Sequence, residues 1–401
     1  MIMARINKYI IANFCAELSG RLIEPVFMGA ILLKLFVERK IKHPEFCLFF
    51  IVILIHGLLM TIFTGYDVGK IFQQSFLLFI VLFGYIQLYE RQRSIEYWFS
   101  VYIKFVYLVA ILGLIQYSAY LIFKINIFPY SLDLFKTQNS ARLHSILFEP
   151  GSVVSFFMPA VTFIILSIDY LKKNLIKCII IILAFILTYS SLAFLGIGIA
   201  LIFKFYHFLK RIKILFYILF GFVVYSLLTI NPNVQGVDND ATEYEKAMYK
   251  IQETYLTIET LTSENVSPYS FEGLNESTYA SLTNYWIAFN APCRFFGTGI
   301  GTHQQNYESL YQSSYLSYGL NEDDAYSLFA RILSEFGYLG LIIYLLFVYK
   351  RFNKRNILSF CFLNFIICYL IKGGHYTLYG VVLFHFLYYK CYNTVLKIEK
   401  I

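Results

Sequence analysis

The fold is decided by stretches such as residues 46–64, which read FCLFFIVILIHGLLMTIFT and contain no Asp, Glu, Lys or Arg. A helix satisfies its own backbone hydrogen bonds where no water is present, and about 20 apolar residues suffice to cross the hydrocarbon core of a bilayer. This stretch therefore predicts a helix that spans a membrane.

The composition of the whole chain also indicates a membrane protein. Hydrophobic residues make up 58% of the 401 residues and charged residues only 14%, and the mean hydropathy is +0.61. A soluble domain would carry about 25% charged residues. The net charge of +8 is spread over short connections between apolar runs, so we expect no nucleic acid partner.

Ten further apolar runs resemble this stretch. They lie near residues 22–37, 71–89, 97–123, 149–169, 175–189, 192–208, 213–230, 326–349, 356–371 and 376–392. Together they predict an all-α bundle of eleven spans. Residues 5–20 would add a twelfth, although at about 24 Å they are short for a crossing. They mimic a signal peptide without a convincing cleavage site, and we expect them to be retained.

Basic residues occupy every second connection between these runs and mark the cytoplasmic side. They are Arg39, Lys40, Lys42, Arg91, Arg93, Lys172, Lys173, Lys177, Lys204, Lys210, Arg211, Lys213, Lys350, Arg351, Lys354 and Arg355, with Lys390, Lys397 and Lys400 near the C-terminus. The other connections lie outside, and the long ones comprise residues 124–148 and 231–325. The second holds 13 of the 25 acidic residues.

Three parts are therefore expected: N-terminal spans over residues 1–230, a large polar loop over 231–325, and C-terminal spans over 326–401. Within the loop, residues 241–262 have apolar side chains at helical spacing and predict an amphipathic helix. Six of the seven cysteines fall inside apolar runs, and Cys293 has no expected partner on its own side of the membrane. No disulfide framework is predicted.

The first candidate site lies where a span begins on the outer side, in the segment from Arg142 to Gly151 that also contains His144 and Glu149. A guanidinium presents a planar fork suited to phosphate oxygens, so Arg142 is a candidate diphosphate ligand. Glu149 precedes Pro150 at a predicted helix N-terminus. There it is either a structural cap or a functional carboxylate.

A second candidate runs from Arg294 through Gly297, Gly299 and Gly301 to His303. Alternate glycines can bind an anion through backbone N–H groups, but this spacing differs from the dinucleotide fingerprint. The glycines are equally consistent with a flexible structural turn.

The third candidate is the pair of Arg331 and Glu335, which lie four residues apart in an apolar run and share one helix face. Charges inside a span are costly unless they are paired or hydrated, so such pairs often mark a functional pathway. The alternative is a purely structural ion pair. His375 is expected to face the same outer side as the other candidates.

These segments resemble the bacterial O-antigen polymerase family and, more distantly, the O-antigen ligases. The resemblance rests on Arg142 to Gly151, on the Thr/Ser-rich hairpin from Thr188 to Phe194, and on Gly297 to Gly301 together with the helix through Glu335 to Gly337. The chain has Tyr326-Ser327 where ligases have a His-Asn pair, which favours the polymerase. It also has Ser191 where an arginine is often expected in the hairpin.

The resemblance implies a glycosyltransferase of the bacterial inner membrane, with its large loop in the periplasm. It would move a glycan from one undecaprenyl diphosphate onto a lipid-linked repeat unit. Site roles are assigned as follows: Arg142, Arg294 and Arg331 as substrate contacts, with Glu335, His144 and His375 beside them, and Glu149 as general base with His303 second. We expect no cofactor and no metal, and a chain-length regulator is a possible partner.

Two other functions compete with this interpretation. The first is an O-antigen ligase, and the null phenotype separates the two: loss of a polymerase leaves surface lipid capped by a single repeat unit, whereas loss of a ligase leaves it uncapped. A lipid-linked sugar flippase or other transporter should have short loops on both sides and charged residues in many spans, whereas this chain has a large loop on one side and no detectable internal repeat.

Overall fold

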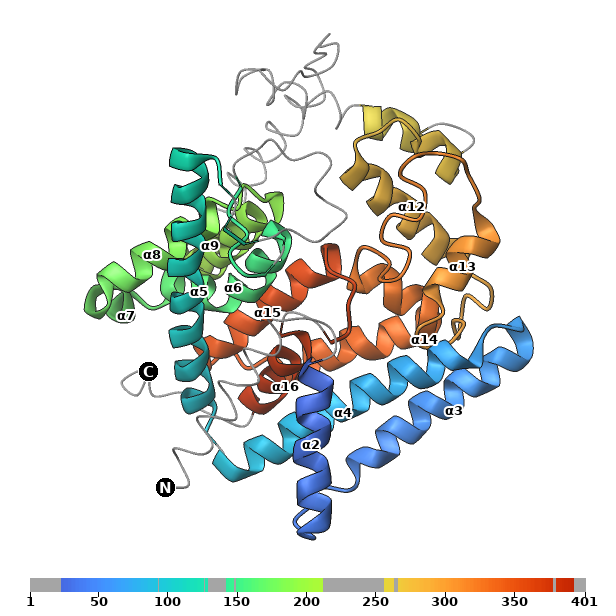
Figure 1. Cartoon of the computed structure of the whole chain (residues 1–401), viewed down its shortest axis with the longest axis horizontal. Helices are drawn as coiled ribbons and strands as arrows, with labels where there is room; N and C mark the ends of the chain where they lie inside the picture. The colour runs from blue at the N-terminus through green and yellow to red at the C-terminus, as the bar shows by residue number, and fades with distance from the viewer. Residues whose placement is uncertain are drawn as a thin grey trace.

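The computed structural model describes residues 23–92, 94–125, 127–128, 142–147, 149–211, 256–262, 266–377 and 380–392 (Figure 1). Regular structure in these residues is helical, without a strand. The elements are α2 Ile23–Val37, α3 Phe46–Thr64, α4 Val68–Gln92, α5 Ile95–Phe123, α6 Pro150–Leu166, α7 Ile168–Lys173, α8 Leu175–Ile186, α9 Ser191–Arg211, the 3-10 helix η2 Pro268–Phe271, α12 Glu276–Asn290, α13 His303–Leu310, α14 Leu328–Arg351, α15 Ile357–Ile371 and α16 Val381–Cys391.

Each predicted apolar run that the structure describes contains a helix, although the runs 175–189 and 376–392 are longer than α8 and α16. The run 149–169 breaks at Ser167 into α6 and α7, because the Ser167 side chain accepts a hydrogen bond from the backbone N–H of Tyr170 and starts a new helix. The runs predicted at 5–20 and 213–230 lie outside the described residues, as does most of the predicted amphipathic helix, of which residues 256–262 are helical.

Among the described helices, four are long and apolar enough to cross a membrane: Phe46–Thr64, Val68–Glu90, Ile95–Phe123 and Leu328–Arg351. The other apolar helices have 10–17 residues. A 12-residue helix such as α8 measures about 18 Å, less than the roughly 30 Å of the hydrocarbon core. The structure therefore shows an all-helical protein with four candidate spans, fewer than the eleven or twelve predicted.

Helix α3 presents apolar side chains to its surroundings along its whole length. Only 11% of this segment is buried against the rest of the protein, and Ile62 and Phe63 are 77% and 74% exposed. An apolar surface of this kind is unfavourable in water and favourable in lipid. Helices α3, α4 and α14 lie side by side, while α5 runs across their direction (Figure 1).

The centre of the molecule is formed by α6 and α15, which pack on each other and on α9. Nearly all of α6 is buried. The buried amide of Asn364 on α15 donates to the Thr162 hydroxyl on α6 and to the Gly196 carbonyl on α9, both at 2.8 Å. One side chain thus joins three apolar helices where an unpaired amide would be costly.

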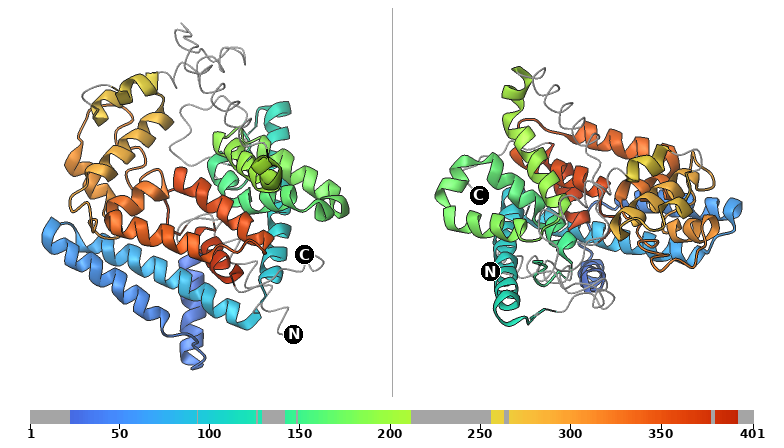
Figure 2. Two further views of the ribbon diagram at one scale, coloured as in Figure 1. Left: turned by 180° about the vertical axis from the view of Figure 1, so that it is seen from behind. Right: turned by 90° about the horizontal axis from the view of Figure 1, so that it is seen from above.

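Residues 266–325, the last part of the predicted polar loop, form a helical lobe with η2, α12 and α13. The lobe has its own hydrophobic cluster of Phe271, Tyr279, Ile287, Tyr307 and Tyr311. It stands beside α3, α4 and α14, apart from the group formed by α6 to α9 (Figures 1 and 2).

Helix α14 is interrupted at Gly337, whose φ of 64° and ψ of −168° are not helical. Past this point the N–H groups of Tyr338 and Leu339 donate to the carbonyls of Arg294 and Phe295, at 3.0 Å each. The carbonyls of Ser334 and Glu335, which those N–H groups would bind in a continuous helix, accept from Thr298 and Gly299 at 3.2 and 2.8 Å.

Candidate functional site

Arg331 and Glu335 form an ion pair inside the first half of α14. The Arg331 Nε lies 3.0 Å from Glu335 Oε1, and their side chains are 3% and 0% exposed. Ser327 starts the helix by accepting the N–H of Ala330 with its side chain. This start sets the register that places both charged groups on the same buried face, one turn apart.

The connection between α15 and α16 completes the environment of this pair. The Arg331 Nη1 donates to the Gly374 carbonyl at 2.9 Å, and the guanidinium carbon lies 4.2 Å from the centre of the Tyr376 ring. The Tyr376 hydroxyl donates to the second oxygen of Glu335 at 2.8 Å. Both carboxylate oxygens are therefore bonded, as a buried charge requires.

A second acid–base pair lies next to this cluster. The Nε2 of His375 is 3.1 Å from Asp324 Oδ2, and the other oxygen of Asp324 accepts from the Asn321 amide and from the N–H of Tyr326, both at 3.1 Å. His375 is partly exposed, whereas Arg331 is not. The predicted site residues His375, Arg331 and Glu335 are thus brought together.

Two glycines make this approach of chain segments possible. The N–H of Gly373 donates to the Tyr326 carbonyl at 2.8 Å, and Gly373 has a φ of 130°. At Gly374 a side-chain carbon would overlap the Asp324 carbonyl oxygen. The sequence Lys372-Gly-Gly is therefore required for the loop to lie against the start of α14.

Lys372 adds a positive charge at the edge of the lobe. Its ammonium lies 5.3 Å from the centre of the Tyr326 ring and 3.5 Å from the Ser277 hydroxyl, which is 2.8 Å from the Tyr326 hydroxyl. Ser277 is at the N-terminus of α12.

Arg142 is held by the turn between α8 and α9. Its Nε donates to the Thr188 carbonyl at 3.1 Å and an NH2 donates to the Tyr189 carbonyl at 3.4 Å. The neighbouring N–H of Leu143 donates to the Leu187 carbonyl at 3.0 Å. Arg142 thus has a structural role as well as a partly exposed side chain, and two of the segments that carry the family resemblance lie in contact.

His144 and Glu149, in the same connection, differ in exposure. The ring of His144 is completely buried, and burial lowers its pKa to about 4, so it is neutral at pH 7. Glu149 is exposed and takes the N-cap position of α6 with an extended backbone, but its carboxylate does not cap that helix. The capping role considered for this carboxylate is therefore not observed.

His303 lies inside the lobe with no exposed surface. Both amide hydrogens of Asn284 are donated to carbonyls, so its oxygen accepts from His303 Nε2, 2.9 Å away. The Nδ1 of His303 then carries a lone pair and has no hydrogen-bond partner. Burial, with a smaller contribution from the positive charge of Arg331, lowers the pKa of His303 to about 3. This buried ring has no path to a substrate hydroxyl in this conformation.

The glycine-rich segment supports α14 in the observed fold. The N–H groups of Gly297, Thr298 and Gly299 all donate to backbone carbonyls. Gly297, Gly299 and Gly301 have φ of 76°, 104° and 82°, and each passes close to another element. These N–H groups therefore form a structural turn, and nearby Arg294 is exposed and donates to Asn290 at the end of α12, at 3.1 Å.

The predicted site residues thus fall into separate groups. Arg331, Glu335 and His375 share one cluster, and His303 is close enough to feel the charge of Arg331. The connection with Arg142, His144 and Glu149 packs against the turn between α8 and α9, and Arg294 is held at the end of α12. The lobe and the group formed by α6 to α9 lie apart in each view of Figures 1 and 2.

Sequence reasoning missed the residues supplied by other segments: Asp324, Lys372, Gly374 and Tyr376. The run Lys372-Gly-Gly-His-Tyr376 between two apolar runs was the available signal, because a cation, two glycines and two polar rings are unusual at a short turn. In the part of the chain that the structure describes, no group of three or more His, Cys, Asp or Glu side chains could hold a metal ion.

No protein-family model matches this chain, and a comparison with curated proteins gives no significant match.

Proposed function

We propose that this protein is a surface-polysaccharide polymerase that joins undecaprenyl diphosphate-linked repeat units by glycosyl transfer at the outer face of the bacterial inner membrane. The single observation that carries the proposal is the polar cluster of Arg331, Glu335 and Tyr376 at the lobe end of an apolar helix. A polar cluster at the boundary between the apolar part of α14 and the lobe suits a reaction between lipid-linked substrates.

In this proposal the chain crosses the membrane eleven or twelve times, and the lobe lies in the periplasm. The shorter helices would complete their crossings together with the segments that adjoin them. The concentration of polar groups at the lobe end favours chemistry at one face over transport through the bundle.

The leaving group of the proposed reaction is a diphosphate, so the site must stabilise its charge, position the acceptor hydroxyl and remove one proton. Lys372 keeps a partly exposed cationic group beside the cluster for the first task. Arg142 and Arg294 are also at least partly exposed but lie in separate groups, so we assign them to the glycan-lipid parts of the substrates and not to the same phosphates. Arg331 contributes by holding the loop that carries Lys372. Glu149 is the exposed carboxylate for proton removal.

The test supplies purified full-length protein with undecaprenyl diphosphate-linked repeat units. A ladder of products supports the proposal. Its absence from preparations of folded, full-length protein contradicts the proposal. Arg142→Ala and Glu149→Gln should each lower ladder formation at least about 100-fold, in the range expected for loss of one charge-stabilising or proton-transfer group. Lys354→Ala, an exposed change at the opposite end of α14, is the matched control.

An O-antigen ligase is the second candidate within the same reaction class. Transfer of the glycan to a lipid A core acceptor, without elongation of the lipid-linked repeat unit, would replace the polymerase assignment by the ligase. If both the Arg142→Ala and the Glu149→Gln variants still formed the full ladder, the proposed reaction would stand, but the assignment of these two residues to it would be wrong.

A further inference from the structure

A cavity of about 380 Å³ lies where the turn between α2 and α3 meets the C-terminal end of α4. Its lining combines basic side chains with a buried amide and one carboxylate: Leu35, Arg39, Lys40, Ile41, Lys42, Gln87 and Glu90. Pockets that bind small ligands measure about 300–1,000 Å³. The cavity is therefore large enough for a small polar group.

The charges around this cavity favour an anion. In the described part of the chain, the side chains of Arg39 and Lys42 have no acidic partner, whereas Lys40 pairs with Glu38 at 2.9 Å. The only lining carboxylate, Glu90, already lies 3.4 Å from His43 and 3.7 Å from Lys390. Positive charge therefore exceeds negative charge at the cavity.

The backbone places Arg39 at a position that normally belongs to glycine. The N–H of Lys40 donates to the Leu35 carbonyl at 2.9 Å and that of Arg39 to the Phe36 carbonyl at 3.0 Å, which is the hydrogen-bond pattern that closes many helices. Arg39 occupies the left-handed residue of this pattern, with φ of 51°. Glycine would adopt this backbone with less strain, so Arg39→Gly removes the charge and leaves the turn intact.

The turn is also held firmly from the side of α4. Gln87, buried to 2% exposure, accepts the N–H of Lys42 at 2.9 Å with its side-chain oxygen and donates to the Lys42 carbonyl with its amide. These two bonds fix the backbone of Lys42, so that its ammonium extends from an ordered position. A preformed arrangement of cations binds an anion with less loss of entropy.

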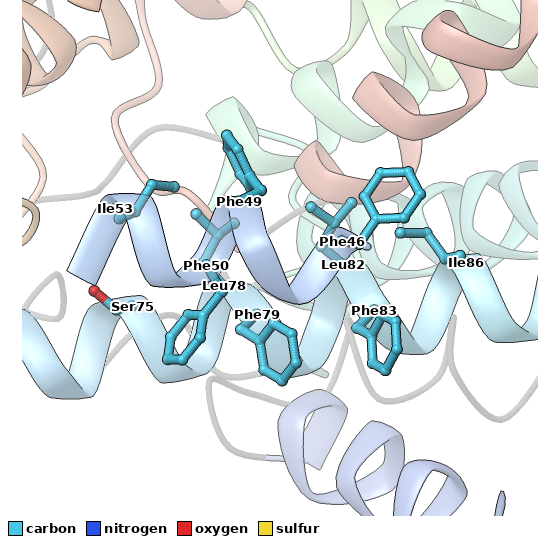
Figure 3. A pocket seen from close by; sticks show the side chains of 10 residues that line it. All are labelled: Phe46, Phe49, Phe50, Ile53, Ser75, Leu78, Phe79, Leu82, Phe83 and Ile86. Carbon is cyan, nitrogen blue, oxygen red and sulfur yellow. The ribbon is translucent and has the colours of Figure 1, made fainter. Parts of the chain in front are cut away.

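An apolar groove leads away from the cavity between α3 and α4. Figure 3 shows its lining, with Phe46 and Ile86 at one end and Ile53 and Ser75 at the other. Phe83 precedes Gln87 by four residues and Ile86 precedes Glu90 by four, so groove and cavity follow each other along one face of α4. The groove is shallow, with a cavity volume of only about 10 Å³, so a hydrocarbon chain would lie over its phenylalanine-rich surface rather than inside it.

The two ends of α4 also locate the cavity. Near its start, Lys70 donates to Gln304 and the N–H of Asp67 to Gln305, both at 3.0 Å, so that end lies against the lobe. The helix has 25 residues and is therefore roughly 37 Å long, which exceeds the roughly 30 Å of the hydrocarbon core. The cavity lies at the other end, one bilayer thickness from the lobe.

We propose that this cavity and groove bind one anionic phospholipid from the leaflet opposite the lobe. Arg39 and Lys42 hold the phosphodiester of the headgroup, and one acyl chain lies over the apolar surface formed by α3 and α4. A soluble phosphate compound would fill the cavity but leave the adjoining apolar groove unused. A zwitterionic lipid would carry a cation into a site that already has an excess of positive charge.

The experiment measures lipid retained by the purified full-length protein, by native mass spectrometry after incubation with phosphatidylglycerol or phosphatidylcholine. The test variant is Arg39→Gly with Lys42→Ala, because glycine relieves the strained backbone and keeps the fold. The control is Lys354→Ala with Arg355→Ala, which removes the same charge from two exposed residues of the turn between α14 and α15.

We expect the wild type and the control to retain phosphatidylglycerol in preference to phosphatidylcholine, and the test variant to lose about tenfold or more of that retention. The thermal unfolding midpoint of the double variant Arg39→Gly with Lys42→Ala should equal or exceed that of Lys42→Ala alone, because the glycine relieves the strained backbone. Equal retention of both lipids, equal losses in test and control variants, or full displacement by millimolar glycerol phosphate would each overturn the proposal. Because the readout is lipid retention, it is independent of any glycosyl transfer.

Discussion

Arg331 and Glu335 show at the scale of single residues how an apolar helix tolerates charge: each charged group is bonded to the other and to a neighbouring loop. Replacing Glu335 by Gln leaves the guanidinium buried beside a neutral partner, at a cost of about 3–5 kcal/mol. Tyr376→Phe removes one hydrogen bond to the carboxylate and should cost about 1–3 kcal/mol. Thermal unfolding in detergent should rank the variants in this order, and the reverse order would contradict the ion-pair account.

A paired apolar replacement separates a structural role of this pair from a functional one. Arg331→Met combined with Glu335→Leu removes both buried charges, and we expect it to recover most of the stability lost in Glu335→Gln. If the pair serves the proposed reaction, the folded double variant should still fail to form a product ladder. A stable double variant with full polymer synthesis would show that the pair only supports the fold.

His303 gives a prediction about pH. Its pKa is about 3 in the folded protein and about 6.5 in an unfolded chain, so protonation favours the unfolded state. Its contribution to stability is complete above pH 6.5 and is lost as the pH falls toward 3. Between pH 7 and pH 5 the loss is about 2 kcal/mol. The unfolding midpoint of His303→Gln should therefore fall less steeply over this range than that of the wild type; parallel curves would contradict the assignment.

The residue scale also shows what spacing in a sequence can predict. The four-residue separation of Arg331 and Glu335 predicted a shared helix face, and the structure has the corresponding ion pair. The partners Gly374 and Tyr376 lie more than 40 residues further along the chain. Local periodicity carries no information about such contacts, and the same holds for the carbonyls that bind Arg142.

At the scale of elements, the interruption of α14 depends on one glycine. The backbone angles of Gly337 lie in a region open essentially to glycine alone, and an added side-chain carbon would meet the Phe295 carbonyl. Gly337→Ala should therefore destabilise the protein by about 2–3 kcal/mol or more. Gly198→Ala in α9 meets no neighbour and should be neutral or stabilising by about 0.5–1 kcal/mol. Equal unfolding midpoints for the two variants would contradict this view of the kink.

Apolar runs predicted the helices well because basic or polar turns separate them. The predicted run 46–64 has the same bounds as α3, and the predicted run 22–37 ends at the last residue of α2. The kink at Gly337 could not be predicted in this way, since it is stabilised by residues 294–299, which lie far outside any window around the glycine. The lengths of the shorter helices were overestimated for a related reason: apolar side chains continue into turns that pack against the bundle.

At the scale of the whole molecule, orientation is tested with the native cysteines. Cys293 is an exposed residue of the lobe, and Cys178, Cys361, Cys368 and Cys391 are buried. In a chain that keeps only Cys293, a membrane-impermeant maleimide added to intact spheroplasts should label most of the protein. In the cysteine-free chain with Arg355→Cys, labelling should require permeabilisation. The opposite pattern would place the lobe in the cytoplasm and remove the basis for a periplasmic reaction.

The exchange of hydrogen bonds between residues 294–299 and α14 also has a consequence for biosynthesis. The ribosome makes residues 294–299 before α14, so the segment that supplies its missing bonds is already present when the helix emerges. Until the two dock, the carbonyls of Ser334 and Glu335 can bind the N–H groups of Tyr338 and Leu339, as in a continuous helix, so α14 can enter lipid straight and fully bonded. The kink at Gly337 therefore forms when residues 294–299 dock, and it belongs to the folding of the lobe rather than to insertion.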